Sequence, residues 1–205
     1  MTDETVEEVR RRFDQRAASY DDSTMHRGLA ERVAGFAELE GVTAVLDVAT
    51  GTGLVLRALR ARDDARGVRL VGLDVSPGML AVARQALPDA ELLEADATVL
   101  PLPGASIDLV TCVTGLQMFP DPDAAVREWA RVLRPGGRVV TATFAEFDPA
   151  EHRGGAVDQF RRHDRFRTPE LLQAALEPGG FVHRRHERWM HGGDVVLIAE
   201  AEARG

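Results

Sequence analysis

Glycines and two aspartates stand where apolar segments of the sequence end. The apolar segment 44–48 contains Asp47 and runs into a turn with Gly51 and Gly53, after which apolar residues follow helical spacing. Glycines in such a turn let the backbone approach a ligand closely, and the amides of the next helix point at that ligand. The second apolar segment ends in Asp74, about 20 residues beyond the turn, where a carboxylate can accept hydrogen bonds from both ribose hydroxyls. Together these residues predict an adenosine site, with a tight turn and a helix-capping aspartate as the purely structural alternative.

The spacing of the glycines argues against a dinucleotide. The G-x-G-x-x-G/A fingerprint needs a small third residue, because the helix packs closely on the strand there. Counting from Gly51 and Gly53 puts Leu56 at that position, and counting from Ala49 and Gly51 puts Leu54 there. Both side chains are too large, so NAD and FAD are not expected.

The elements that must position these residues alternate between short apolar segments and amphipathic ones. Strand alternating with helix is typical of a parallel sheet covered on both faces. Gly192 and Gly193 separate the last two strands and suit a hairpin turn, so an antiparallel pair closes the predicted α/β fold. The expected strands are 44–48, 69–74, 90–94, 107–113, 138–144, 181–188 and 194–201, and the helices among them are 54–62, 77–86, 123–133 and 169–178.

The domain organisation follows from the same pattern. We expect a single domain over 1–205, with an N-terminal helical cap at 1–40, a ligand-binding core at 43–144 and a variable segment with the last strands at 145–205. The cap contains two helices, at about 4–20 and 26–40. The irregular stretch 146–167, rich in arginine and histidine, has two open interpretations: a mobile cap over a site or a solvated loop.

Composition excludes several classes of function. The net charge of −8 repels phosphate backbones, so no nucleic-acid partner is expected. All 25 basic residues are arginine, and without lysine there is no Schiff base and no Walker A motif. The single cysteine, Cys112, lies in an apolar segment and reads as a core residue. No apolar segment approaches the ~18 residues that span a bilayer, and the N-terminus is acidic, so we expect a cytoplasmic protein with no membrane contact.

Histidines and arginines near the C-terminus suggest no metal site. His183 and His186 lie three residues apart, which on a regular strand places them on opposite faces and makes a chelate poor. Arg184 and Arg185 read as a solvated charge run that discourages pairing at a sheet edge.

A resemblance to a known family extends this interpretation. The segment 47–53 resembles motif I of class I S-adenosylmethionine-dependent methyltransferases, of the small-molecule type that includes the quinone-biosynthesis C-methyltransferases. Segments 72–80, 94–103 and 131–137 resemble three further motifs of that family, in the same order. One departure is Ala49, where many members have glycine. The resemblance implies a Rossmann-like, seven-stranded, mainly parallel sheet with helices on both faces.

The resemblance also implies S-adenosylmethionine as the cofactor, S-adenosylhomocysteine as its product, and roles by position. Asp47 would organise the turn near the methionine amino group, and Asp74 would hold the ribose. Asp96 would accept a hydrogen bond from the adenine amino group, while the amide of the next residue donates to the ring. Val75 and Met79 would contact the adenine faces, with core packing as the alternative. The complete implied set is Asp47, Ala49, Thr50, Gly51, Thr52, Gly53, Asp74, Val75, Met79, Asp96, Ala97 and Val113.

Three residues are candidates on the acceptor side. A sulfonium methyl is already activated, so the protein must place a nucleophile about 3–3.5 Å from it and, for a weakly acidic nucleophile, supply a base. Tyr20 and His26 precede the first motif, and Gln117 follows the fourth strand. His26 could act as the base, or be a surface residue of its helix. Gln117 could orient a substrate oxygen, or be a polar loop residue.

Three functions follow from this set. The first is methyl transfer to a small molecule, as in secondary metabolism. The second is a non-methylating cyclase or decarboxylase that keeps the cofactor, and the third is a regulatory or interaction module with a vestigial site. The intact acids Asp47, Asp74 and Asp96 disfavour the third. Residues 113–117 lack the Asp/Asn-Pro-Pro-Tyr/Phe motif of exocyclic-amine methyltransferases of DNA or protein. The first two functions stay open, as does the oligomeric state.

Overall fold

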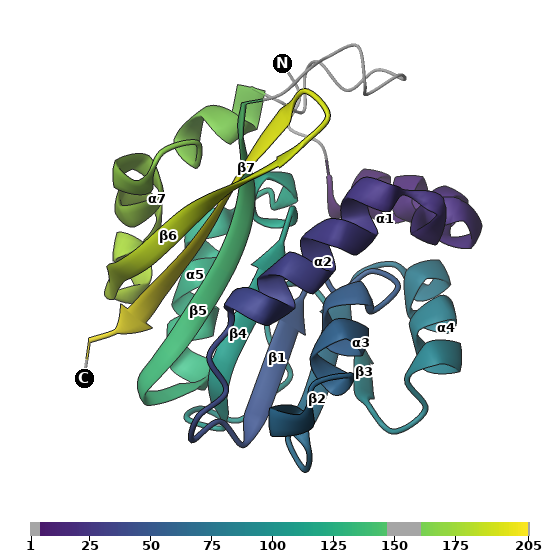
Figure 1. Cartoon of the computed structure of the whole chain (residues 1–205), viewed down its shortest axis with the longest axis horizontal. Helices are drawn as coiled ribbons and strands as arrows, with labels where there is room; N and C mark the ends of the chain where they lie inside the picture. Colours follow the sequence, from purple (N-terminus) through teal and green to yellow (C-terminus); the bar gives the residue numbers. More distant parts are fainter. Residues whose placement is uncertain (1–4, 147–160, 205) are drawn as a thin grey trace.

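The computed structural model describes residues 5–146 and 161–204, and its strands form one mixed sheet (Figure 1). The strand order in the described residues is β3-β2-β1-β4-β5-β7-β6, with β7 antiparallel to both of its neighbours and the other pairs parallel. The predicted α/β sheet with a C-terminal antiparallel pair is confirmed. The strands are β1 Ala44–Val48, β2 Arg69–Asp74, β3 Glu91–Glu94, β4 Ile107–Val113, β5 Leu133–Glu146, β6 Phe181–His191 and β7 Asp194–Ala203.

The main helices begin at capping side chains that the sequence supplies. Ser76, Asp121 and Thr168 each accept a hydrogen bond from a first-turn amide, and each is followed by proline at the first helical position. The predicted helix 4–20 is shorter than expected, because the chain tightens into a 3-10 turn before Ser23 caps the next helix. The helices are α1 Val6–Arg16, α2 Thr24–Phe36, α3 Leu54–Arg60, α4 Pro77–Ala86, α5 Pro122–Val132 and α7 Pro169–Leu176, with 3-10 turns η1 Ala17–Asp22, η2 Asp63–Ala65, η3 Leu116–Met118, η4 Arg161–Arg165 and η5 Glu177–Gly179.

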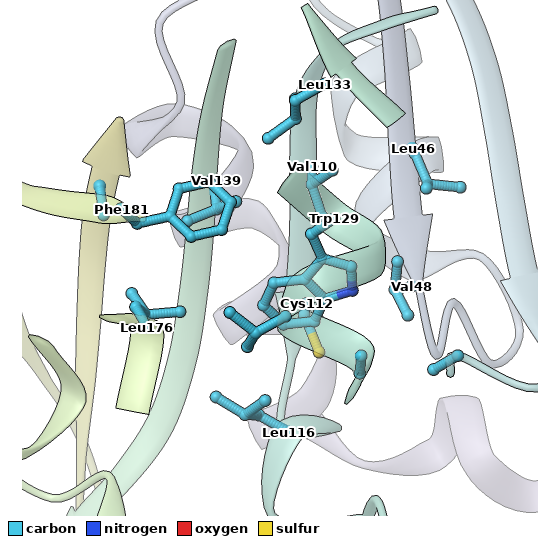
Figure 2. Close-up of a cluster of buried hydrophobic side chains, with 14 of the residues drawn as sticks. Leu46, Val48, Val110, Cys112, Leu116, Trp129, Leu133, Val139, Leu176 and Phe181 are labelled. Atoms are coloured by element: carbon cyan, nitrogen blue, oxygen red, sulfur yellow. The ribbon is translucent and has the colours of Figure 1, made fainter. Parts of the chain in front are cut away.

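Two apolar layers hold the helices against the sheet. Helices α2 and α3 pack their buried leucines and valines on one face, and α5 and α7 pack on the other. Figure 2 shows Trp129, Cys112 and Leu116 within the second layer, and each of the three is fully buried. Cys112 is therefore a core residue, as the sequence predicts. Among the described residues, no helix is both long and apolar enough to cross a membrane.

A register shift in β6 overturns two expectations. The pairing with β7 slips between His183 and Arg185, so that Arg184 is the extra residue of a bulge. His183 and His186 therefore share a face, with Nε2 of His183 3.1 Å from Nδ1 of His186. The prediction of opposite faces was wrong, because it assumed a regular strand.

The bulge also turns Arg185 inward, so it is not part of a solvated edge. Its guanidinium donates to the Phe36 carbonyl at 2.8 Å and to Glu200 at 3.0 Å, and lies 4.2 Å from the centre of the Phe36 ring. Glu200 is only 4% exposed, so Arg185 neutralises a buried carboxylate and fastens β6 to α2.

The irregular stretch 146–167 is described only at its ends, since residues 147–160 lie outside the described part of the chain. After η4, Phe166 is buried, and its carbonyl accepts a hydrogen bond from the Thr143 hydroxyl at 2.9 Å. That end of the stretch therefore belongs to the core rather than to a solvated loop.

Candidate active site

The predicted site residues meet at the carboxyl edge of the sheet, where β2, β1 and β4 end side by side. Ligands of open α/β sheets bind at this edge, beside the point where the strand order reverses. A pocket that is partly open to solvent lies there beneath α1. Its lining comprises Val6, Val9, Phe13, Tyr20, Ala49, Gly51, Leu73, Asp74, Val75, Met79, Ala95, Asp96, Ala97, Val113, Thr114, Gly115, Met118, Phe119 and Pro120.

Two buried carboxylates organise the loops that form this pocket. Asp74 accepts the Gly51 amide at 2.8 Å on one oxygen and the Ser76 amide at 2.9 Å on the other. Asp47 accepts the Thr111 hydroxyl at 2.6 Å and is 1% exposed. Burial raises the pKa of both carboxylates, to about 6 for Asp47. Each is thus held by hydrogen bonds in a place that disfavours its charge.

The two loops press against each other with strained backbone. Ala49 and Thr114 have φ angles of 58° and 52°, in the left-handed region that is costly for residues with a side chain. Between them, a Cβ on Gly115 would lie 2.8 Å from the Ala49 Cβ and 3.0 Å from the Cys112 sulfur. Glycine is therefore required at 115 for the close approach of the loops.

A second, smaller pocket adjoins the first at the glycine turn. Tyr20 lies between the two, and its ring is stacked on His26 with centroids 4.4 Å apart. Burial raises the pKa of Tyr20 to about 12, so the phenol stays protonated at neutral pH. The second lining comprises Tyr20, His26, Leu29, Ala30, Asp47, Ala49, Thr50, Gly51, Leu54, Val55, Val113 and Thr114.

Most of the implied cofactor set lines one pocket or the other, but two members do not. The Thr52 hydroxyl donates to Asp21 at 2.5 Å, away from both linings. Gly53 precedes α3 with φ of 79°, and a Cβ there would lie 2.9 Å from Leu87. Its role is thus in packing and in the turn.

The three acceptor-side candidates separate in the same way. Tyr20 and His26 line the second pocket, whereas Gln117 is 3% exposed and lines neither. The Gln117 side-chain amide donates to the Thr114 carbonyl at 2.6 Å and thereby fixes the strained loop. Its contact with substrate stays a prediction.

Sequence reasoning predicted an N-terminal helical cap but did not identify which of its residues line the first pocket. Val6, Val9 and Phe13 of α1 line it, at the spacing of one face of a helix. That spacing was visible in the sequence, but nothing local indicated what the apolar stripe would cover. Met118 and Phe119, which follow β4, also line this pocket.

Comparison with known proteins identifies the central part of the chain. Residues 46–141 match the family model described as a methyltransferase domain. This matched segment is a methyltransferase domain. It includes Asp47, Asp74 and Asp96, the acids that reach the pockets.

Curated relatives are methyltransferases, and solved structures share the fold. A demethylmenaquinone methyltransferase of Thermus thermophilus is 43% identical over 104 residues, which cover 49% of this chain and 46% of the relative. A malonyl-acyl-carrier-protein O-methyltransferase of Serratia marcescens is 37% identical over 134 residues, covering 65% and 51%. The alignments thus span about half the length of these relatives. The structure of the 4+2 cyclase SpnF has the same fold, with a TM-score of 0.69, 21% identity and coverage of 87% of this chain and 81% of that one.

Proposed function

We propose that the protein transfers a methyl group from S-adenosylmethionine to a small molecule. The observation that carries this proposal is the joining of two pockets at Tyr20 and the glycine turn. The first pocket offers Asp74 and Asp96 with apolar walls between them, which suits an adenosine. The second opens beside the end where Asp47 and Thr50 stand.

The residues present fit the cofactor by the chemistry of their groups. Asp74 and Asp96 are hydrogen-bond acceptors, as ribose hydroxyls and an adenine amino group require. Backbone amides hold one oxygen of Asp96 as well as both of Asp74, since Thr98 donates to Asp96 at 2.8 Å. The carboxylates are therefore oriented before a ligand arrives. When bound, the cofactor supplies an activated sulfonium methyl.

The remaining work of the protein is to position the acceptor and exclude water. The Tyr20 hydroxyl stays neutral, because its pKa of about 12 lies far above neutral pH. In this state it can donate or accept a hydrogen bond. His26 is stacked on Tyr20 in the second pocket. Where the methyl-accepting group of the substrate must lose a proton before it reacts, His26 is the base that takes this proton. Gln117 contributes indirectly by holding the Thr114 carbonyl.

Methyl-labelled cofactor tests the proposal. The full chain is incubated with the labelled cofactor and a small-molecule extract of its source cells, and S-adenosylhomocysteine and labelled products are measured. We expect both to form, and Asp74→Ala to suppress both. Cofactor binding without labelled product would favour a non-methylating enzyme on the same fold. The proposal would be overturned if calorimetry showed that the protein binds neither S-adenosylmethionine nor S-adenosylhomocysteine.

A further inference from the structure

Residues 6–22, comprising α1 and η1, form a lid over the first pocket. Val6, Val9 and Phe13 point into it, and Tyr20 closes its junction with the second. The rest of α1 is largely charged, and only Val9 among its residues is buried. A helix of eleven residues with so little buried surface is marginal alone, so other contacts must hold the lid in place.

The first such contact joins α1 to the start of α4. Oδ1 of Asp14 accepts the Ser76 hydroxyl at 2.6 Å and the Gly78 amide at 2.9 Å. A Cβ on Gly78 would lie 2.9 Å from this oxygen and 3.2 Å from the Asp14 Cα. Ser76 and Gly78 belong to the segment that resembles the second family motif, yet here they serve the lid.

The second contact joins η1 to the turn before α3. Oδ1 of Asp21 accepts the Thr52 hydroxyl at 2.5 Å, and Oδ2 accepts from the Arg57 guanidinium at 2.6 Å. Thr52 belongs to the first motif, whereas Ser76 belongs to the second. Each of these two motifs therefore donates a hydrogen bond to one carboxylate of the lid. Asp14 also lies at the N-terminus of α4, where the macrodipole favours negative charge.

We propose that Asp14 and Asp21 are positioning residues that keep the lid closed and thereby set the rate at which the cofactor product leaves. The inference rests on the proposed function, because it takes the first pocket as the cofactor site. Neither aspartate lines the first or the second pocket. Their influence on the ligand therefore passes through Phe13 and Tyr20 of the lid.

The atoms involved predict different responses to the same conservative change. Asp14 uses one oxygen for both hydrogen bonds, so Asp14→Asn can retain both. Asp21 uses both oxygens, one of them in an ion pair with Arg57 at 2.6 Å. Asp21→Asn would replace this ion pair by a weaker neutral hydrogen bond and would have to turn its amide N–H₂ toward the Thr52 hydroxyl. A carboxylate that served only overall folding would show no such link between its atoms and ligand release.

The experiment measures release of labelled S-adenosylhomocysteine from the full chain after an excess of unlabelled ligand is added. Asp14→Ala, Asp21→Ala and Asp21→Asn should each release it about tenfold faster, as expected for losing a hydrogen bond to a charged group. Asp14→Asn should stay within about threefold of the wild type. Asp22→Ala is the matched control, since Asp22 is the exposed neighbour of Asp21, and it should release at the wild-type rate.

Two results would overturn the inference. In one, both alanine variants release S-adenosylhomocysteine at the wild-type rate; in the other, Asp14→Asn releases it as fast as Asp14→Ala. Hydrogen exchange without ligand gives a second measurement: α1 amides should exchange about tenfold faster in the alanine variants, with the amides of β1 and β4 unchanged. Equal α1 exchange in all variants would also reject it. If the α1 amides exchange as expected but the wild-type chain retains no S-adenosylhomocysteine, the proposed function is wrong. The conclusion that Asp14 and Asp21 keep the lid closed would then still hold.

Discussion

At the scale of the residue, Asp47 is a carboxylate placed where its charge is costly. Its folded-state pKa of about 6 lies above its ordinary value of 3.8, so the unfolded chain ionises first as pH rises. The native state therefore loses stability through that range, and Asp47→Asn avoids the loss while still accepting from Thr111. We expect the stability advantage of Asp47→Asn to grow by roughly 1–2 kcal/mol between about pH 4.5 and pH 8.

Urea unfolding of the two proteins at both pH values measures this difference. The exposed Asp22→Asn serves as the control for removing one negative charge, and its stability difference should vary little. A constant gap between wild type and Asp47→Asn at all pH values would show that Asp47 ionises normally in the folded protein.

His26 offers a second prediction at this scale. If His26 is the base, His26→Ala should lower the turnover of the enzyme by about 10²–10⁴-fold and leave its affinity for the cofactor nearly intact. His26 lines the second pocket together with Asp47 and Thr50, so the alternative role is contact with the amino-acid end of the cofactor. Weakened S-adenosylmethionine binding, with normal turnover at saturating cofactor, would assign His26 to the amino-acid end instead. Initial rates across cofactor concentrations and calorimetry separate the two results.

At the scale of the element, the bulge in β6 divides an apparently uniform charge run. Arg185 faces the buried Glu200, whereas Arg184 is largely exposed and pairs with Glu202 at 3.4 Å. Arg185→Ala should lower the free energy of unfolding by about 1–3 kcal/mol, because a buried carboxylate loses a partner. Arg138, 3.6 Å from Glu200, limits the loss.

Two companion variants test this interpretation by urea unfolding. Arg184→Ala should stay within about 0.5 kcal/mol of the wild type, since exposed ion pairs contribute little. Glu200→Gln should recover part of the stability of Arg185→Ala, because the unpaired charge is removed. Equal effects of the two arginine substitutions would show that the bulge does not distinguish them.

At the scale of the whole molecule, ligand binding at the carboxyl edge should stabilise the fold. At 100 times its dissociation constant, S-adenosylhomocysteine should add about 2.7 kcal/mol and raise the thermal midpoint by roughly 5–10 °C. Asp74→Ala should show a much smaller shift at the same concentration, because the ribose loses its acceptor. Differential scanning calorimetry checks both, and an equal shift in the variant would place the ribose elsewhere.

The same scale shows what the sequence could predict. Strand and helix periodicity located all seven strands of the described residues, because each element carries its own apolar pattern. Six lie within three positions of the expected bounds, whereas β5 begins five residues before the expected 138. The glycine turn and Asp74 were recognisable because their spacing is local. The bulge at Arg184 and the partners of Thr52, Ser76 and Gln117 were not, because they depend on which side chains meet after distant segments pack.

The packing of the two tryptophans makes the protein its own optical sensor. Trp129 lies edge-to-face with Phe119, which lines the first pocket, with ring centroids 6.5 Å apart. Trp189 lies against α2 instead, where a Cβ on Gly28 would be 3.3 Å from its ring. The chain has no other tryptophan, so Trp189→Phe leaves a single indole whose emission responds to the pocket wall. Ligand arrival and departure can then be followed in real time by intrinsic fluorescence, without attaching a dye.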